Sequence, residues 1–330
     1  MHSTLYLALF TCVILPHVRV FAGNVVICMT VCNDRGVEAI VSIKSALLVS
    51  KPYNQYFFHI FTDESEGVRQ SLAPLRTLSK ETGETKLNNI FFYFHTLQQH
   101  SNLTYVRNFV ETLRYEVPRL SVGRRYRCAM DKVVIPALFQ KLIVVDTDTL
   151  WLEDPYNLMK QIDDFNSENT LGLAREVEGK IRAGWYHKRD QRGRPFYGLN
   201  GLNSGVVIYR IDKPDSYLEH MKDLLVRYKD NMPTVDQDLI NAYAEKFPKQ
   251  LHLLSCQWNR RHYSGCYSKQ VAGIVHGTGR LFFKVSTNPT RKKQSRRNME
   301  WPPRIRQSWV TRLPYLRAYQ IVEAIPFHGL

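Results

Sequence analysis

The chain has 330 residues, of which 44% are hydrophobic and 12% aromatic, so it can bury a substantial core and is not an intrinsically disordered polypeptide. Its net charge of +15 comes from basic residues spread along the sequence, and neither a zinc-finger spacing nor a helix-turn-helix pattern accompanies them. We therefore expect a solvated basic surface, with some attraction for a negatively charged nucleotide or an acidic membrane, and no nucleic-acid partner.

The N-terminal 22 residues have the features of a targeting segment. Leu5–Leu15 is an apolar stretch too short to cross a bilayer comfortably. Val20 and Ala22 occupy the small-residue positions of a signal-peptidase site. We interpret residues 1–22 as a signal peptide or, if uncleaved, a short type II membrane anchor. Either alternative places residues 23–330 in the lumen of the secretory pathway, in the Golgi or the endoplasmic reticulum.

Apolar runs and helical periodicities alternate through the following part of the chain. A helical pattern passes through Ile40, Ile43, Leu47 and Leu48, and a second covers about 65–79, where Pro74 argues for a break. The strand-like runs are Val25–Met29, Tyr56–Phe61 and Ile90–Phe94. This alternation predicts a doubly wound, parallel α/β sheet.

The second half of the chain is less regular. Residues 96–123 are polar, and we interpret them as an irregular insertion. Residues 175–200 are expected to form a loop over the site, and about 288–300 a mobile basic region. The predicted elements are a helix at Tyr126–Phe139, strands at Leu142–Val145, Leu171–Ala174 and Val206–Tyr209, and helices at Tyr217–Tyr228 and Asp238–Lys246.

Cysteines in a secretory chain can form disulfides. Cys256 and Cys266 bracket a short loop, so we expect them to pair. Cys28 and Cys32 lie on and just after the first predicted strand, and we expect both to be small buried hydrophobic residues. An acceptor sequence for N-glycosylation begins at Asn102.

Asp146 and Asp148 follow an apolar run that is typical of a buried parallel strand. The carboxyl end of such a strand faces the crevice where open α/β sheets bind ligands. With alternate residues on one side of the strand, the two carboxylates would share one hard cation, which could hold a diphosphate. The alternatives are a solvated loop and a cap for the next helix.

Three further motifs contain residues suited to such a site. The amide of Asn203 could bind sugar hydroxyls, although Asn203-Ser204-Gly205 could also be a plain turn. Asp236-Gln237-Asp238 precedes a predicted helix; the amide of Gln237 could face a reacting sugar, and at least one Asp is expected to cap the helix. His276 could be a third metal ligand or a structural histidine, and Gly277 would let a diphosphate approach the backbone.

Together these motifs resemble glycosyltransferase family eight, and in particular the glucoside xylosyltransferases. The resemblance runs from about Val25 to about His276, and the segments 195–198 and 256–259 favour the xylosyl branch. It implies an α/β fold of the glycosyltransferase-A type, with a Rossmann-like mixed sheet flanked by helices, and one catalytic domain at 23–330. The matching segments are Ser42–Leu48, Phe58–Thr62, Val145–Asp148, Gly184–Tyr186, Pro195–Gly198, Gly201–Val206, Asp236–Leu239, Cys256–Asn259 and Val275–Gly277.

The resemblance also implies roles for individual residues. Asp146, Asp148 and His276 would hold a divalent metal, usually Mn2+, that bridges the diphosphate of a UDP-sugar donor. The catalytic residues would be Asn203, Gln237 and Asp238. Lys132 stands where many relatives carry Arg, and Lys284 is an alternative to Arg280 as the basic residue after the metal-binding histidine. The donor and cofactor site would comprise Thr30, Val31, Cys32, Asn33, Asp34, Arg35, Lys132, Asp146, Thr147, Asp148, Asn203, Gln237, His276, Gly277 and Arg280.

The activity that this resemblance implies is retaining, α-linked transfer of xylose from UDP-xylose to an O-linked glucose on a glycoprotein with EGF-like repeats. Departure of UDP puts negative charge on the β-phosphate, which a metal and Lys132 would stabilise. That phosphate could accept the acceptor proton, or Gln237 could act as a weak nucleophile. Trp185, Tyr186, Phe196 and Tyr197 could stack on acceptor sugars or anchor a loop. The alternatives are a family-eight transferase that uses UDP-glucose or UDP-galactose, and a non-catalytic sugar- or nucleotide-binding protein of the same fold.

Overall fold

The computed structural model describes residues 23–32, 35–63, 65–80, 89–116, 124–178, 196–266, 271–278, 282 and 309–326. The predicted targeting segment at 1–22 and the basic region at about 288–300 lie outside these residues, as does most of the predicted loop at 175–200. None of the helices in the described ranges has both the length and the apolar character needed to cross a membrane.

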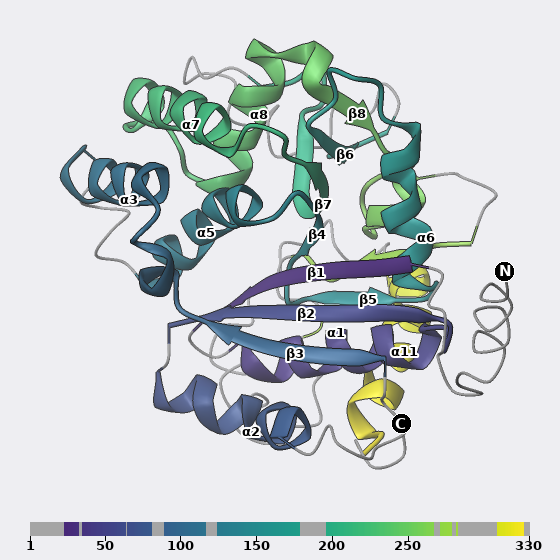
Figure 1. The fold of residues 1–330 in the computed structure, drawn as a ribbon. Helices are drawn as coiled ribbons and strands as arrows, with labels where there is room; N and C mark the ends of the chain where they lie inside the picture. Colours follow the sequence, from purple (N-terminus) through teal and green to yellow (C-terminus); the bar gives the residue numbers. More distant parts are fainter. Residues whose placement is uncertain are drawn as a thin grey trace, which may run out of the picture.

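A mixed seven-stranded sheet forms the centre of the fold, with strand order β3-β2-β1-β4-β7-β6-β8 (Figure 1). The first four of these strands run parallel to one another, whereas β7 runs antiparallel to both β4 and β6, and β8 is parallel to β6. Their bounds are β1 Gly23–Val31, β2 Asn54–Thr62, β3 Ile90–His95, β4 Lys141–Val145, β6 Leu171–Arg175, β7 Leu202–Arg210 and β8 Leu251–Leu253. The predicted mixed α/β sheet is confirmed.

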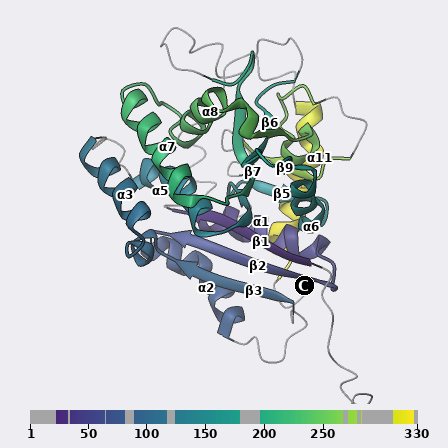
Figure 2. The same cartoon turned by 45° about the horizontal axis from the view of Figure 1, so that its top comes forward.

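Helices cover the sheet in two groups (Figures 1 and 2). One hydrophobic core packs α1 (Gly36–Val49), α2 (Glu66–Lys80) and α6 (Pro155–Met159) against the sheet, and α11 (Trp309–Ala324) packs outside α1. The second core contains α3 (Thr104–Glu116), α5 (Arg124–Val134), α7 (Pro214–Tyr228) and α8 (Asp236–Lys246). Short 3₁₀-helices are η1 Leu97–His100, η2 Ile135–Leu138, η3 Lys160–Asp164, η5 Pro248–Gln250 and η6 Cys256–Asn259.

A separate two-stranded sheet lies at the carboxyl end of β4. In it, β5 (Thr149–Trp151) pairs antiparallel with β9 (Ile274–His276). Thr149 is the partner of His276 in this register, so the residue just after Asp148 lies beside a residue 127 positions further along the chain. This sheet brings the two halves of the candidate site together.

Two predictions of irregular structure were wrong. The supposed insertion at 96–123 contains α3, whose Val106, Phe109 and Leu113 are buried at helical spacing in the second core. Pro74 does not break α2, because Val68, Leu72 and Leu75 hold one face of the helix against the sheet while the Pro ring is exposed.

Two element boundaries also differ from the prediction. The helix expected at 126–139 is α5 followed by η2, so its last residues form a tighter 3₁₀ turn around Pro136. β7 begins at Leu202, so Asn203 and Ser204 lie within a strand and do not form a plain turn. Both side chains are buried, which a turn on the surface would not require.

The cysteine predictions are partly confirmed. The Cys256–Cys266 disulfide is present, and Cys28 is a free thiol in the core, where burial raises its pKa. Cys32 is buried as predicted, but its disulfide with Cys128 of α5 was not predicted. This disulfide links the residue just after β1 to α5, across a sequence separation of 96 residues. Asn102, at the predicted glycosylation sequence, is exposed in a turn before α3.

Three histidines form a cluster at one end of β2 and β3. His59 Nδ1 lies 3.0 Å from His95 Nε2, and the rings of His95 and His100 have their centroids 5.4 Å apart. Burial and the two neighbouring imidazoles lower the pKa of His59 to about 4. The cluster is therefore neutral in the folded chain at neutral pH.

Candidate functional site

Asp146, Asp148 and His276 converge on one point. His276 Nε2 lies 3.3 Å from Asp146 Oδ2 and 3.3 Å from Asp148 Oδ1. One ligand atom from each residue falls within 4.8 Å of the other two. Two hard carboxylate oxygens and one imidazole nitrogen suit a divalent first-row metal. These residues therefore fit a metal ion such as the one implied by the sequence resemblance.

The two carboxylates meet because of a turn. β4 ends at Val145, and residues 146–148 form the connection to β5. The prediction that strand alternation places both Asp side chains on one side was therefore wrong, although the predicted convergence is present. The backbone N–H of Asp146 donates to the carbonyl of Gly205 in β7, which fixes the start of the turn.

His276 is held from two sides. Its ring is buried at the end of β9, and Nδ1 lies 3.0 Å from Oδ1 of Asn259. A Cβ atom added at Gly205 would overlap this ring, so only glycine fits at that position of β7. Burial alone would lower the pKa of His276, but the Asp148 and Asp146 carboxylates outweigh it and raise the pKa to about 9. The negative field that favours imidazolium also favours a bound cation.

Lys132 bridges the metal-site carboxylates to α8. Its Nζ lies 2.6 Å from Asp146 Oδ1 and 2.7 Å from Asp236 Oδ2. Burial opposes its charge, but the two carboxylates outweigh that effect and raise the pKa of Lys132. The same ammonium group lowers the pKa of Asp146, against the effect of burial. Lys132 is thus a permanent positive charge directly behind the metal-binding point.

Asn203 and Gln237 lie side by side and share a buried carboxylate. Asn203 Nδ2 donates to Gln237 Oε1 at 3.2 Å, and both amide nitrogens donate to Glu176 Oε2, at 2.7 Å and 3.3 Å respectively. Ser204 Oγ donates to Asp236 Oδ2 at 2.9 Å. The two motifs that were predicted to contact a sugar therefore form one connected group beside Lys132.

Asp238 has a local backbone contact. It lies in the first turn of α8, where its Oδ2 accepts the backbone N–H of Thr234 at 2.6 Å. The prediction that one of the two Asp residues is the N-cap was wrong, because Val235 is the N-cap without a side-chain cap hydrogen bond, and Asp238 instead binds the backbone of Thr234 just before the helix.

The start of the predicted uridine loop lies beside the metal-binding point. Thr30 and Val31 end β1, whose Met29 is paired with Val145 of β4. Cys32 is tied to α5 by its disulfide, and Arg35 pairs with Glu38 while lying 4.0 Å from Asp148. Asn33, Asp34 and Arg280 lie outside the described residues, as do Trp185, Tyr186 and Lys284.

Two remaining donor-site residues are structurally constrained. Thr147 is buried within the turn between the two Asp residues. The N–H of Gly277 donates to the carbonyl of Asp148 at 2.7 Å, and a Cβ atom there would overlap Phe282. The glycine is thus required by packing, whether or not a diphosphate approaches it.

Two residues of this group, Glu176 and Asn259, had no predicted role, and both are fully buried polar side chains. Asp236 was predicted only as a possible helix cap, whereas in the structure it accepts from Lys132. The one sequence feature that pointed to Asn259 was its place in a segment that resembles the family. Glu176 comes just after a predicted strand, as do Asp146 and Asp148, and this position could have been used to predict it as a site residue.

The chain is similar in sequence to curated glucoside xylosyltransferases. No family model matches the chain. The chain is 28% identical over 270 residues to rat glucoside xylosyltransferase 1, and 28% identical over 276 residues to mouse glucoside xylosyltransferase 2. These matches cover 74% of this chain in both cases, and 56% and 55% of the two relatives. The chain resembles the glucoside xylosyltransferases, as predicted. It spans just over half the length of these curated relatives.

Solved structures support the fold of this glucoside xylosyltransferase-like chain. Mouse xyloside xylosyltransferase 1, in its apo form, matches with a TM-score of 0.56 and 18% identity, covering 78% of this chain and 99% of that one. The galactosyltransferase LgtC, solved with donor and acceptor sugar analogues, matches with a TM-score of 0.50 and 14% identity over 86% of this chain and 99% of that one. The predicted glycosyltransferase-A fold is confirmed.

Proposed function

We propose that this chain is a metal-dependent, retaining glycosyltransferase that transfers xylose from UDP-xylose, in α linkage, to an O-linked glucose on a glycoprotein such as one with EGF-like repeats. The main support is the convergence of Asp146, Asp148 and His276 beside Lys132. The names of the relatives, glucoside xylosyltransferase 1 and 2, support the donor sugar and the glucoside acceptor. Residues 23–330 would form a single catalytic domain.

In this proposal Asp146, Asp148 and His276 hold Mn2+. The bound ion would neutralise the donor diphosphate and stabilise the charge on the departing UDP. Lys132 contributes a positive charge whose position is set by Asp146 and Asp236. Because this charge is fixed in place before the reaction, it favours the departing phosphate without a further reorganisation cost. Gly277 and Arg280 would contact the same diphosphate.

The donor would lie along the carboxyl end of the parallel strands. Residues 30–35 would bind the uridine, while Asn203 and Gln237, with Asp238 on the same helix as Gln237, would face the sugar. In the transfer the bond between C1 and the β-phosphate oxygen breaks, and UDP leaves with the electron pair. The acceptor hydroxyl oxygen bonds to C1 from the same face, and its proton passes to the departing phosphate oxygen. No strong protein base is required for this step.

The secretory lumen is the proposed compartment. The two disulfides, Cys32–Cys128 and Cys256–Cys266, are typical of an oxidising environment. Residues 1–22 would deliver the chain there, as a signal peptide or as a short membrane anchor.

Turnover against a panel of UDP-sugars, with and without Mn2+ and with a glucoside acceptor, tests the proposal. We expect transfer from UDP-xylose that EDTA stops. Asp148→Asn should abolish transfer while leaving thermal unfolding near that of the wild type, and Asp164→Asn, which changes an exposed carboxylate of η3, is the matched control. Transfer from UDP-glucose or UDP-galactose instead would change the donor assignment. Binding of Mn2+ and UDP-xylose without any turnover would indicate a non-catalytic binding protein.

A further inference from the structure

Asn259 touches both halves of the candidate site. Its side chain is fully buried at the end of η6. Oδ1 lies 3.0 Å from Nδ1 of His276, and Nδ2 lies 2.8 Å from Oδ1 of Asn203. One carboxamide therefore joins a predicted metal ligand to a predicted sugar-binding amide.

A backbone group fixes the direction of every hydrogen bond in this chain of contacts. The N–H of Gly205 donates to Oδ1 of Asn203 at 3.0 Å, so that atom must be an acceptor. The atom of Asn259 that faces it must then be the NH2 group, which turns the carbonyl of Asn259 toward His276. An acceptor at that position requires a hydrogen on Nδ1, so when the ring is neutral, as a metal ligand must be, its lone pair lies on Nε2.

This tautomer is the one that a metal needs. Nε2 is the atom that lies 3.3 Å from both Asp146 and Asp148. Metal-binding histidines commonly donate their other ring N–H to an oxygen, and such a partner sets the orientation of the ring. Asn259 supplies that oxygen without adding a negative charge.

The orientations of the two amides predicted to bind the sugar, Asn203 and Gln237, are fixed in a similar way. With Oδ1 of Asn203 occupied by Gly205 and Asn259, its Nδ2 faces Glu176 and Gln237. Ser204 N–H donates to Oε1 of Gln237 at 3.4 Å, so the Gln237 amide is fixed by a second backbone donor. Asn259 Nδ2 donates to the same oxygen of Asn203 as the Gly205 N–H, so Asn259 reinforces the orientation of Asn203 and reaches Gln237 through it.

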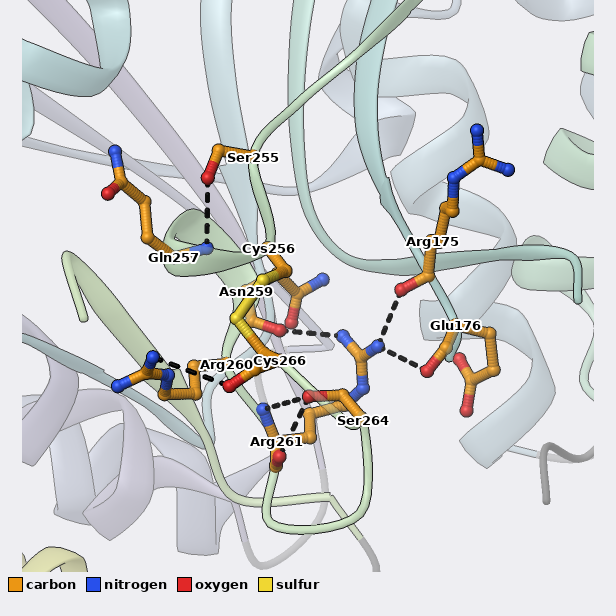
Figure 3. The surroundings of a disulfide bond; sticks show 10 residues. All are labelled: Arg175, Glu176, Ser255, Cys256, Gln257, Asn259, Arg260, Arg261, Ser264 and Cys266. Atoms are coloured by element: carbon orange, nitrogen blue, oxygen red, sulfur yellow. Dashed lines mark hydrogen bonds between the residues drawn. A yellow bond between two sulfur atoms is a disulfide. The ribbon is translucent and has the colours of Figure 1, made fainter. Parts of the chain in front are cut away.

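The backbone around Asn259 is itself held tightly. η6 lies in the loop closed by the Cys256–Cys266 disulfide, and the Arg261 guanidinium donates to the carbonyls of Asn259, Arg175 and Glu176 (Figure 3). This buried guanidinium joins the segment that carries Asn259 to the end of β6, where Glu176 lies. These contacts therefore hold the backbone that carries the Asn259 carboxamide in a fixed position.

We propose that Asn259 is a positioning residue that couples the cation site to the sugar-binding amides. It holds His276 as the tautomer with Nε2 toward the cation, and it holds Asn203 with its NH2 group toward Glu176 and Gln237. The sugar half rests on the proposed function, whereas the cation half stands on geometry alone. If Asn259 had only a packing role, its substitution would impair cation binding and sugar binding together. Variants that impair one kind of binding without the other therefore test the proposal.

Two substitutions separate the halves. Asn259→Leu removes both contacts and should weaken Mn2+ binding by about 10- to 100-fold, as losses of such supporting contacts do. Asn259→Asp keeps an oxygen for Nδ1–H but places a second oxygen against Oδ1 of Asn203. Its Mn2+ affinity should therefore stay near the wild-type value, while its preference for UDP-xylose over UDP falls and kcat drops by about 10²-fold, as a small misplacement can cause. Gln257→Ala, in the same 3₁₀-helix, is the matched control and should leave every value unchanged.

Mn2+ titrated into metal-stripped protein, followed by electron paramagnetic resonance, measures the cation half without any turnover. Affinities for UDP-xylose and UDP measure the sugar half, and thermal unfolding checks each variant; the Asp variant keeps the test valid should the Leu variant not fold. The proposal is overturned if Asn259→Leu binds Mn2+ as tightly as the wild type. It is also overturned if Asn259→Asp folds and its Mn2+ affinity falls by as large a factor as its preference for UDP-xylose over UDP. If wild-type protein binds Mn2+ but no UDP-sugar, the proposed function fails and the sugar half with it, while the cation half is still decided by the titration.

Discussion

Lys132 offers a sharp test of the electrostatics of the site. Its ammonium group lies 2.6 Å from Asp146 and 2.7 Å from Asp236, with only 6% of its side chain exposed. The substitution Lys132→Met keeps most of the volume and removes the charge. Asp236 is then left as a carboxylate whose side chain is 11% exposed, with no positive partner at that contact.

The expected loss follows from these distances. At an effective dielectric constant of about 20, each attraction is about 6 kcal/mol before desolvation is subtracted. Burying three charges offsets most of this sum, and removal of one partner from a buried pair typically costs about 3–5 kcal/mol. For a chain of this size we expect Lys132→Met to lower the thermal midpoint by about 10 °C.

Thermal and urea unfolding in EDTA measure this loss, since a bound cation would partly neutralise Asp146. Lys132→Arg keeps the charge and should lose less. The double variant Lys132→Met/Asp236→Asn removes the stranded carboxylate and should recover about half of the loss. An unchanged midpoint for Lys132→Met, or a double variant that is no more stable than the single one, would refute the reasoning.

Three further predictions concern other parts of the molecule. The pKa of His59 is lowered to about 4 in the folded chain, so as the pH falls below about 6.5 the unfolded chain takes up the proton first. The free energy of unfolding should therefore be constant above pH about 6.5 and fall by about 1–2 kcal/mol toward pH 4. Urea unfolding of His59→Phe should show a smaller change over the same pH range. Replacing both Cys32 and Cys128 by Ser opens a loop with a sequence separation of 96, so it should cost about 2 kcal/mol more in urea unfolding than removing the disulfide with a separation of 10. Gly205→Ala should weaken Mn2+ binding by at least about tenfold in a titration, since the new methyl group displaces the metal-site imidazole, whereas Gly67→Ala meets no atom within 4 Å and serves as its control.

The longer strands of the central sheet were the most predictable part of the fold, whereas β5, β8 and β9, of three residues each, were not predicted. β1 and β4 are buried on both faces, so their apolar runs stand out in the sequence. α3 was missed although Val106, Phe109 and Leu113 are buried and Val110 packs beside them. These positions have the spacing of an amphipathic helix, so the signal was present among the polar residues of 96–123 and could have been used.

The candidate site was predictable in its residue types but not in its connections. Asp146, Asp148 and His276 could be grouped by family resemblance, yet their meeting depends on a turn and on a second small sheet. Glu176 and Asn259 could not be found from polarity, since a buried polar side chain and an exposed one look alike in a sequence. Pairing of Cys32 with Cys128 likewise depends on distances that only the folded chain defines.

The pairing of β5 with β9 makes metal affinity a measure of how much of the chain has folded. Thr149 and His276 are neighbours across this small sheet although 127 positions separate them in sequence. Closing so long a loop has an entropic cost that is recovered only when the intervening strands and helices have already assembled. A nascent or truncated polypeptide that ends before β9 has the two aspartates but not the histidine. Tight binding of a divalent cation would then mark the last stage of maturation, and the folded population could be followed by that property alone.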